Sequence, residues 1–206
     1  MDFSKTTNKQ EKLEPGKTYH IYNKAISHDK LFVTEKDYFF FLRKLHRYIL
    51  PIAHIVAYCL VPNHFHLLVT LKEADEIPGM PENDRDEQAR KISKTFSNLF
   101  NSYTRSFNIA HKRSGRLFLY PFKRILVDNE DYFACLITYI HRNPVHHGLS
   151  KDYDKWKYSS YNAYLSQKPT AIALEEGMSP FGSLEEFVLF HKENKIKPGM
   201  EEYFME

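Results

Sequence analysis

The chain has 206 residues, of which 42% are hydrophobic and 15% aromatic, enough for one domain with a sizeable core and an appendage. Its net charge of +3 argues for no partner by itself, because local clustering of charge matters more than the total. Cys59 and Cys135 lie in apolar runs, which indicates buried free thiols in a reducing cytosol and excludes a disulfide framework. The polar N-terminus lacks a signal-peptide core and no apolar run could cross a bilayer, so we expect a cytoplasmic protein with no membrane partner.

The first half of the chain carries alternating and helical hydrophobic patterns. They predict a strand at 17–26, a helix at 34–51, and two further strands at 53–61 and 64–71. Thr34 and Asp37 form a candidate capping box at the start of the helix. A Pro-Asn turn joins the last two strands, which predicts that they are antiparallel neighbours.

The second half begins with an acidic surface loop at 72–87. The patterns after it predict a helix at about 86–108, a basic loop at 111–124, a short strand at 124–127 and a helix at 128–143. A proline follows Asn143, and we expect the last helix to end there because the residue before a proline disfavours the helical conformation. One further helix is expected at 184–194, where Ser183 and Glu186 form a second capping box.

The order of these elements alternates helices with strands but includes one hairpin. It predicts an α+β fold with a ferredoxin-like split βαβ arrangement, in which a mainly antiparallel sheet has its helices packed on one face. The predicted organisation is one domain at 17–165, a polar N-terminal tail at 1–16 and a C-terminal extension at 166–206.

Two histidines lie one residue apart in the third predicted strand. Side chains alternate between the faces of a strand, so His64 and His66 point to the same side. Two imidazoles at this spacing can share one metal ion, with a third ligand from elsewhere and positions left open for substrate. The alternative is a partly exposed strand face that happens to carry histidines.

The helix predicted at 128–143 carries a phenol and a carboxamide at the edge of its apolar stripe. Tyr139 and Asn143 are four residues apart and therefore lie one turn apart on the same side. A tyrosine hydroxyl can act as a nucleophile and would form a phosphotyrosine with a phosphodiester. A divalent metal on His64 and His66 would polarise that phosphate. These parts favour strand cleavage of a nucleic acid, against the alternative of a boundary tyrosine and a helix-terminal asparagine.

Basic and polar side chains accompany these groups. On the long helix they recur at helical spacing, at Lys94, Asn98, Asn101 and Arg105. The loop after it supplies further cations among aromatics, at His111, Lys112, Arg113, Arg116, Lys123 and Arg124. Cations for backbone phosphates and aromatics for stacking bases indicate single-strand binding. The alternatives are a solvated helix face and a loop whose aromatics anchor it to the core.

Four stretches in this order, "TYHIYNKA", "AYCLVPNHFHLLVTL", "SGRLFLYPFKRILVD" and "YIHRNPVHHGL", resemble the IS200-like single-tyrosine HUH transposases, and among them the REP-associated tyrosine transposases. The resemblance covers residues 17–165. It implies that His64 and His66 bind Mg²⁺ or Mn²⁺, and that Tyr139 is the nucleophile that becomes joined to a 5′ phosphate and leaves a free 3′ hydroxyl. Asn143 stands where family members carry a glutamine that completes the metal site.

The resemblance therefore implies a metal-dependent single-stranded DNA transesterase acting on hairpin or palindromic ends, as a monomer or a homodimer. Two alternatives stay open. One is a catalytically inactive, domesticated protein that binds DNA hairpins, which the asparagine at position 143 favours. The other is an unrelated hydrolase of small molecules, which would need further metal ligands such as His146 and His147.

Overall fold

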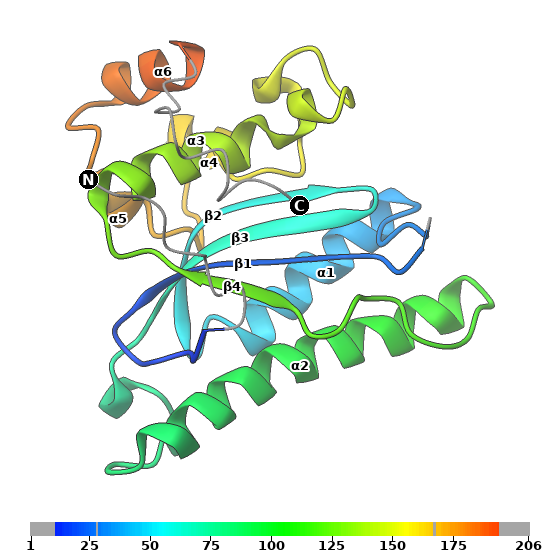
Figure 1. The fold of residues 1–206 in the computed structure, drawn as a ribbon. Coiled ribbons are helices and arrows are strands. Elements are labelled where there is room, and N and C mark those ends of the chain that lie inside the picture. Colours follow the sequence, from blue (N-terminus) through cyan, green and yellow to red (C-terminus); the bar gives the residue numbers. More distant parts are fainter. Residues whose placement is uncertain (1–10, 28, 167, 194–206) are drawn as a thin grey trace.

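A four-stranded antiparallel sheet forms the centre of the molecule (Figure 1). The structure is a computed structural model that describes residues 11–27, 29–166 and 168–193. In spatial order the strands are β2 (Ala53–Val61), β3 (His64–Leu71), β1 (Thr18–Lys24) and β4 (Lys123–Leu126). β2 and β3 have the predicted bounds, because the Pro62-Asn63 turn fixes both of their adjoining ends.

Two crossover helices connect these strands. α1 (Glu35–Tyr48) joins β1 to β2, and α2 (Arg85–Ala110) joins β3 to β4. β1 and β2 are each antiparallel to β3 and hence parallel to one another, with β3 inserted between them. This is the split βαβ arrangement, so the predicted α+β class is confirmed. Asp37 accepts the backbone N–H of Thr34 at 2.7 Å, as the predicted capping box requires.

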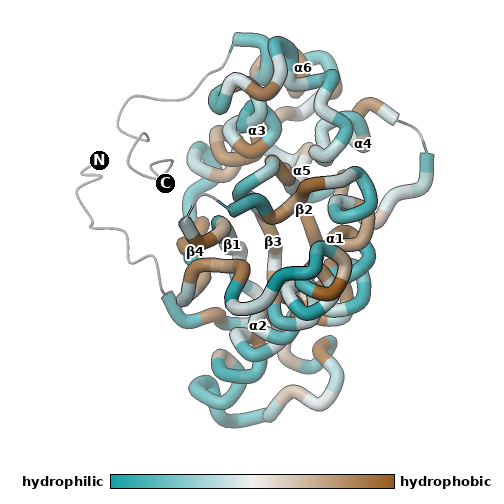
Figure 2. The backbone as a smooth tube through the Cα atoms, turned by 90° about the vertical axis from the view of Figure 1, so that its right-hand side faces the viewer, coloured by the Kyte–Doolittle hydropathy of each residue, from teal (hydrophilic) through white to brown (hydrophobic). Residues whose placement is uncertain are grey.

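The sheet is covered on both faces, which corrects the expectation of helices on one face only. α1 and α2 lie on one face, and α3 (Glu130–His146) packs against β2 and β3 on the other (Figure 2). The reason lies in β2 and β3, whose second face is also apolar. Val56, Cys59 and Leu68 are fully buried there, and burial of that face requires a third layer.

Phe65 anchors the core under α1 and α2. Its side chain is 0% exposed, and its ring lies 5.1 Å from the ring of Phe41 and 5.5 Å from that of Phe100. The alternation that sends Phe65 into this core sends the two histidines beside it to the α3 face.

We expect Phe65→Ala to lower the free energy of unfolding by about 3–5 kcal/mol, because the truncation leaves a cavity in a close-packed core. Urea denaturation followed by circular dichroism measures this loss. Phe39→Ala is the matched control, since the Phe39 side chain is 53% exposed. A loss for Phe65→Ala no larger than that of the control would contradict the assigned packing.

α3 continues past Pro144 to His146, so the helix end predicted at Asn143 is wrong. Pro144 cannot donate a backbone hydrogen bond, but this removes only one bond near the end of the helix. Asn143 is fully buried and its side chain contacts His64, which holds it in the helical conformation that a following proline disfavours. The extra turn carries His146 to the sheet side of the helix, with its ring 5.5 Å from that of Tyr139.

The segments at either end of the domain are more structured than expected. Residues 11–16 belong to the predicted polar tail, yet Leu13 is buried and Lys12 O accepts the Tyr19 hydroxyl. The described part of the C-terminal extension contains α5 (Leu174–Met178) and α6 (Leu184–Glu193), where one helix was expected, and α4 (Tyr161–Leu165) precedes them. Residue 194, the predicted end of the last helix, lies outside the described residues. Within the described ranges, no helix has the length and apolarity needed to span a membrane.

Candidate active site

The interface between β3 and α3 gathers the four residues that the sequence singled out. His64 and His66 lie on the same face of β3, with their ring centroids 5.2 Å apart. Tyr139 and Asn143 come down from successive turns of α3, and the Tyr139 ring lies 5.4 Å from that of His66. All four are nearly enclosed, with exposed fractions of 5% for Tyr139, 3% for His64, 1% for His66 and 0% for Asn143.

His64 contacts two amide groups. Its Nε2 lies 2.9 Å from Asn143 Oδ1 and its Nδ1 lies 2.9 Å from Asn63 Oδ1. Because amide oxygens only accept, both contacts are hydrogen bonds only if the imidazole is doubly protonated or one amide presents its NH₂ instead. Adjacent ligands of an octahedral ion with bonds of about 2.1 Å stand about 3 Å apart. The spacing of His64 Nε2 and Asn143 Oδ1 therefore also fits two neighbouring ligands of one divalent cation.

His66 is oriented by a histidine that sequence reasoning missed. His20 Nε2 lies 2.9 Å from His66 Nδ1, and the two rings stack with centroids 5.1 Å apart. This contact occupies Nδ1 of His66 and leaves Nε2 as the nitrogen for a metal. Tyr22 stands directly opposite His66 in the strand register and stacks on both rings. Alternation along the predicted strand 17–26 places His20 and Tyr22 on one face, and that signal could have found them.

A buried chain of hydrogen bonds through two histidines fixes the position of α3 against its neighbours. His191 of α6 donates from Nδ1 to the carbonyl of Phe187 at 2.8 Å, so its Nε2 accepts from His141 Nδ1 at 2.9 Å. His141 Nε2 in turn accepts the Ser160 hydroxyl at 2.8 Å. Burial holds the pKa of His141 well below its usual range and lowers that of His191 to about 4. This chain ties the helix that carries Tyr139 to α6 and to the segment before α4.

Two hollows lead away from the site. A small one beside His64 is lined by Lys24 and Lys123, together with Leu119 and Pro121 of the loop before β4. A second hollow, of about 130 Å³, follows on the other side of that loop and shares Leu119 with the first. Its lining residues include Asn101, Arg116 and Tyr120.

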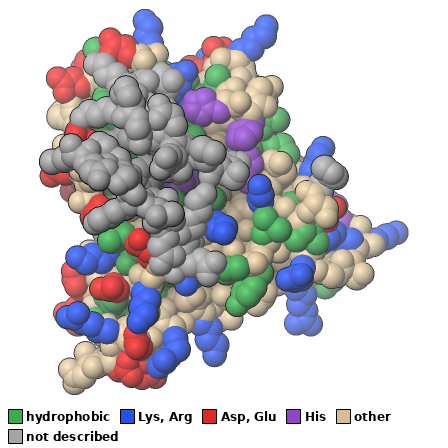
Figure 3. Space-filling view, in the orientation of Figure 1, with side chains coloured by type: hydrophobic (Ala, Val, Ile, Leu, Met, Phe, Trp, Pro, Cys, Tyr) green, Lys and Arg blue, Asp and Glu red, His purple; other side chains and the backbone are tan. Residues whose placement is uncertain are grey.

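The predicted DNA-binding residues do not form one continuous surface. Lys123 lines the hollow next to His64, whereas the neighbouring Arg124 points to the opposite face, where its Nη1 donates to Ser93 Oγ of α2 at 3.3 Å. Exposed positions among the rest are Lys94, Asn98, Asn101 and Arg105 on α2, with Lys112 and Arg116 in the loop. Figure 3 shows Lys and Arg side chains spread over the α2 side of the molecule and histidines gathered at the level of α3.

Two of the predicted contacts to DNA are engaged by the protein itself. His111 Nε2 lies 2.9 Å from Asp37 Oδ1, and Arg113 donates to Asp29 at 2.7 Å. Burial alone would raise the pKa of Asp37, but hydrogen bonds from His111 and Thr34 outweigh it and lower that pKa. These contacts join the basic loop to the start of α1 and to the segment before it. This structural role could not be predicted from the residues of the loop alone.

No group of three or more His, Cys, Asp or Glu side chains suited to a metal occurs in the part of the chain that the structure describes. The ligand set on offer is therefore two imidazoles and one amide oxygen, from His64, His66 and Asn143. His147, whose ring lies 4.6 Å from that of His64, adds no such group. The hydrolase alternative, which needed further ligands, gains no support.

No protein-family profile matches the chain, but one curated protein does. That protein, from Haemophilus influenzae and provisionally named as a REP-associated tyrosine transposase, is 33% identical over 112 residues. The chain is therefore similar in sequence to a REP-associated tyrosine transposase. The match covers 52% of this chain and 58% of the Haemophilus protein, so the chain spans under two thirds of that relative's length.

A solved structure of a REP-associated tyrosine transposase bound to a REP hairpin has the same fold. The TM-score is 0.57 at 18% sequence identity, and the alignment covers 78% of this chain and 86% of the other. At this identity the likeness establishes the fold, which agrees with the α+β class read from the sheet. The resemblance to REP-associated tyrosine transposases expected from the four sequence stretches is thereby confirmed.

Proposed function

We propose that the chain is a single-stranded DNA transesterase that cleaves and rejoins DNA through Tyr139, with a divalent metal, Mg²⁺ or Mn²⁺, held by His64, His66 and Asn143. The observation that carries the proposal is the convergence of these four side chains at the interface of β3 and α3. They come from positions up to 79 residues apart in the sequence, and one fold places all of them within a single nearly enclosed site.

The proposed reaction exchanges one phosphodiester for another. The Tyr139 hydroxyl oxygen attacks phosphorus, its bond to phosphorus forms as the bond to the 3′ oxygen breaks, and the phenolic proton is transferred through solvent to that 3′ oxygen. The products are a 5′-phosphotyrosine and a free 3′ hydroxyl. Because bond types are conserved, the reverse attack by a 3′ hydroxyl rejoins a strand without a nucleotide cofactor.

The side chains suit a hard divalent ion. The spacing of His64 Nε2 and Asn143 Oδ1 fits neighbouring ligands of an octahedral ion, and the contact of His20 with Nδ1 of His66 leaves Nε2 of His66 as the candidate third ligand. When bound, the ion would polarise the phosphate and stabilise the charge that develops on it. Asn143 Nδ2 is buried and has no hydrogen-bond partner in the described structure, so an entering phosphate oxygen could satisfy this donor.

The proposed partner is single-stranded DNA next to a hairpin or palindromic end. Lys24 and Lys123 line the hollow beside His64 and would hold the backbone on either side of the reactive phosphate. The solved relative bound to a REP hairpin supports this class of partner.

A second candidate function is a protein that binds DNA hairpins without cutting them. Tyr139 is only 5% exposed, so the nucleophile is enclosed, and Asn143 replaces the expected glutamine. In that case His64 and Asn143 would form a structural hydrogen bond and bind no metal.

One experiment separates these candidates. A palindromic repeat from the DNA flanking the coding sequence is synthesised with a single-stranded flank and labelled at its 3′ end in one sample and its 5′ end in another. With Mn²⁺ we expect only the 3′ label to appear on the protein in a denaturing gel, because Tyr139 retains the 5′ phosphate of the downstream fragment. EDTA should abolish the adduct. Tight binding in EDTA with no adduct under either condition would favour the binding protein.

A further inference from the structure

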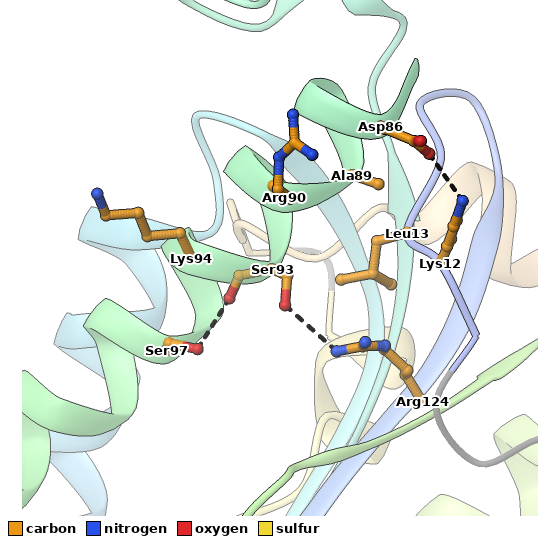
Figure 4. Close-up of a pocket in the computed structure, with 9 residues that line it drawn as sticks. All are labelled: Lys12, Leu13, Asp86, Ala89, Arg90, Ser93, Lys94, Ser97 and Arg124. Carbon is orange, nitrogen blue, oxygen red and sulfur yellow. Dashed lines mark hydrogen bonds and ion pairs between the residues drawn. The ribbon is translucent and has the colours of Figure 1, made fainter. Parts of the chain in front are cut away.

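A third hollow, lined mainly by basic side chains, lies on the other face of the sheet, between the N-terminal segment, α2 and β4 (Figure 4). Its volume is about 530 Å³. Lys12 enters from the N-terminal segment, Arg90 and Lys94 rise from successive turns of α2, and Arg124 reaches across from β4. The hydroxyl groups of Ser93 and Ser97 and the carboxylate of Asp86 also line it. None of these residues takes part in the site around Tyr139.

Four cations and one carboxylate, that of Asp86, line this hollow, so its positive charge is only partly compensated. Lys12 pairs with Asp86 at 2.7 Å, but Arg90, Lys94 and Arg124 have no carboxylate within ion-pair distance among the described residues. Like charges around a shared hollow repel one another, and a bound polyanion would relieve that repulsion.

Arg124 gives the strongest indication of an anionic ligand. Its guanidinium is partly buried, stacks over the ring of Phe122 at 5.0 Å and donates to Ser93 Oγ at 3.3 Å. Burial lowers the pKa of this guanidinium, which means that its charge is poorly solvated. A guanidinium held in a fixed orientation can present parallel N–H donors to the oxygens of a phosphate.

The hollow is connected with the proposed active site along α2. Ser97 lines both this hollow and the next one, which contains Asn101 and Arg116. That second hollow shares Asn23 and Leu119 with the small hollow beside His64. Three neighbouring hollows therefore lie in sequence between the face that carries Arg124 and His64.

We propose that the hollow formed by Lys12, Arg90, Lys94 and Arg124 is a distal phosphate subsite, which binds the DNA backbone beyond the reactive phosphate. This inference rests on the proposed function, since it assumes that DNA is the ligand of the chain. Three cations without a carboxylate partner, an oriented guanidinium, and lining residues shared through a neighbouring hollow with the hollow beside His64 support it. The ligand is the phosphodiester backbone, and base sequence is not read in this hollow.

The test compares two double variants of equal charge. Arg90→Gln/Lys94→Gln removes two exposed cations of the hollow, and Arg43→Gln/Arg47→Gln removes two exposed cations of α1 that line none of the three hollows. Fluorescence anisotropy measures affinity in EDTA across a salt series, for the hairpin with a short flank and with a long flank. EDTA removes the divalent metal that the proposed cleavage requires, so the measured affinities report binding alone.

For the long flank we expect the hollow variant to reduce the slope of log affinity against log salt by about 1 to 1.5, because each lost single-strand phosphate contact contributes about 0.7. Affinity at low salt should fall about tenfold or more, with little change for the short flank or for the α1 variant. Equal slopes for the two double variants would overturn the subsite, as would equal losses on both flanks. Saturable binding of inorganic phosphate that long-flank DNA cannot displace would assign the hollow to a small anion and also overturn it.

The outcome is distinguishable from a failure of the proposed chemistry. A wild-type protein that forms no covalent adduct but shows the expected slope difference would refute the role of Tyr139 and support the subsite. An adduct formed normally by the hollow variant on a short flank, together with the expected loss on the long flank, would support both.

Discussion

Tyr139→Phe is expected to form no covalent adduct with the 3′-labelled hairpin and to cleave it on the order of 10⁴-fold more slowly or worse, as for other enzymes that lose their nucleophile. The substitution removes one oxygen and keeps the ring that packs 5.4 Å from His66, so the fold and hairpin binding should persist. Denaturing gels measure the adduct, and anisotropy in EDTA measures the binding.

Tyr132→Phe is the matched control for this loss. Tyr132 is a buried tyrosine of the same helix, with its ring in the apolar cluster between α3 and the sheet. Its variant should form the adduct at the wild-type rate. If the adduct survives in Tyr139→Phe and disappears in Tyr132→Phe, the nucleophile is Tyr132 and the assignment of Tyr139 is refuted.

His66→Ala is expected to weaken Mn²⁺ binding by more than about 100-fold and to abolish the adduct, because the variant lacks one of the three proposed ligands. His20→Ala should fall between this variant and wild type, about 10- to 100-fold weaker, because His20 only orients the ring of His66 through a 2.9 Å contact. Titration of Mn²⁺ followed by electron paramagnetic resonance measures these affinities without requiring turnover.

His54→Ala serves as the control, since His54 is an exposed histidine of β2 on the same sheet. It should bind Mn²⁺ like wild type. His20→Gln can still hydrogen-bond to His66 and should recover part of the affinity lost in His20→Ala. Hairpin binding in EDTA reports whether each variant is folded. Equal Mn²⁺ affinity in wild type and in folded His66→Ala would remove His66 from the metal site.

The parts of the site that follow strict geometric periods could be predicted from the sequence. His64 and His66 share a face because strand alternation has a period of two, and Tyr139 and Asn143 share a side because a helix repeats every 3.6 residues. The same alternation sends Phe65 into the opposite core. Each of these inferences needs only residues within one element.

What could not be predicted depends on contacts between distant segments. The continuation of α3 through Pro144 follows from the burial of Asn143 against His64, which local propensity does not contain. The side-chain contacts of His111 with Asp37 and of Arg113 with Asp29 join residues 74 and 84 positions apart. The basic loop was therefore predicted to bind DNA although part of it is engaged in the fold. The covering of the second sheet face by α3 likewise depends on contacts between segments that are distant in the sequence.

The candidate site is assembled from two separate layers of the fold, and its four side chains are divided equally between them. The imidazoles belong to the rigid sheet, whereas Tyr139 and Asn143 both belong to α3, one turn apart. A displacement of that single helix would withdraw the proposed nucleophile and the proposed amide ligand together, while both imidazoles stayed in place. The His141–His191 contact fastens α3 to α6, so the position of Tyr139 and Asn143 depends on a segment that lies outside the candidate site.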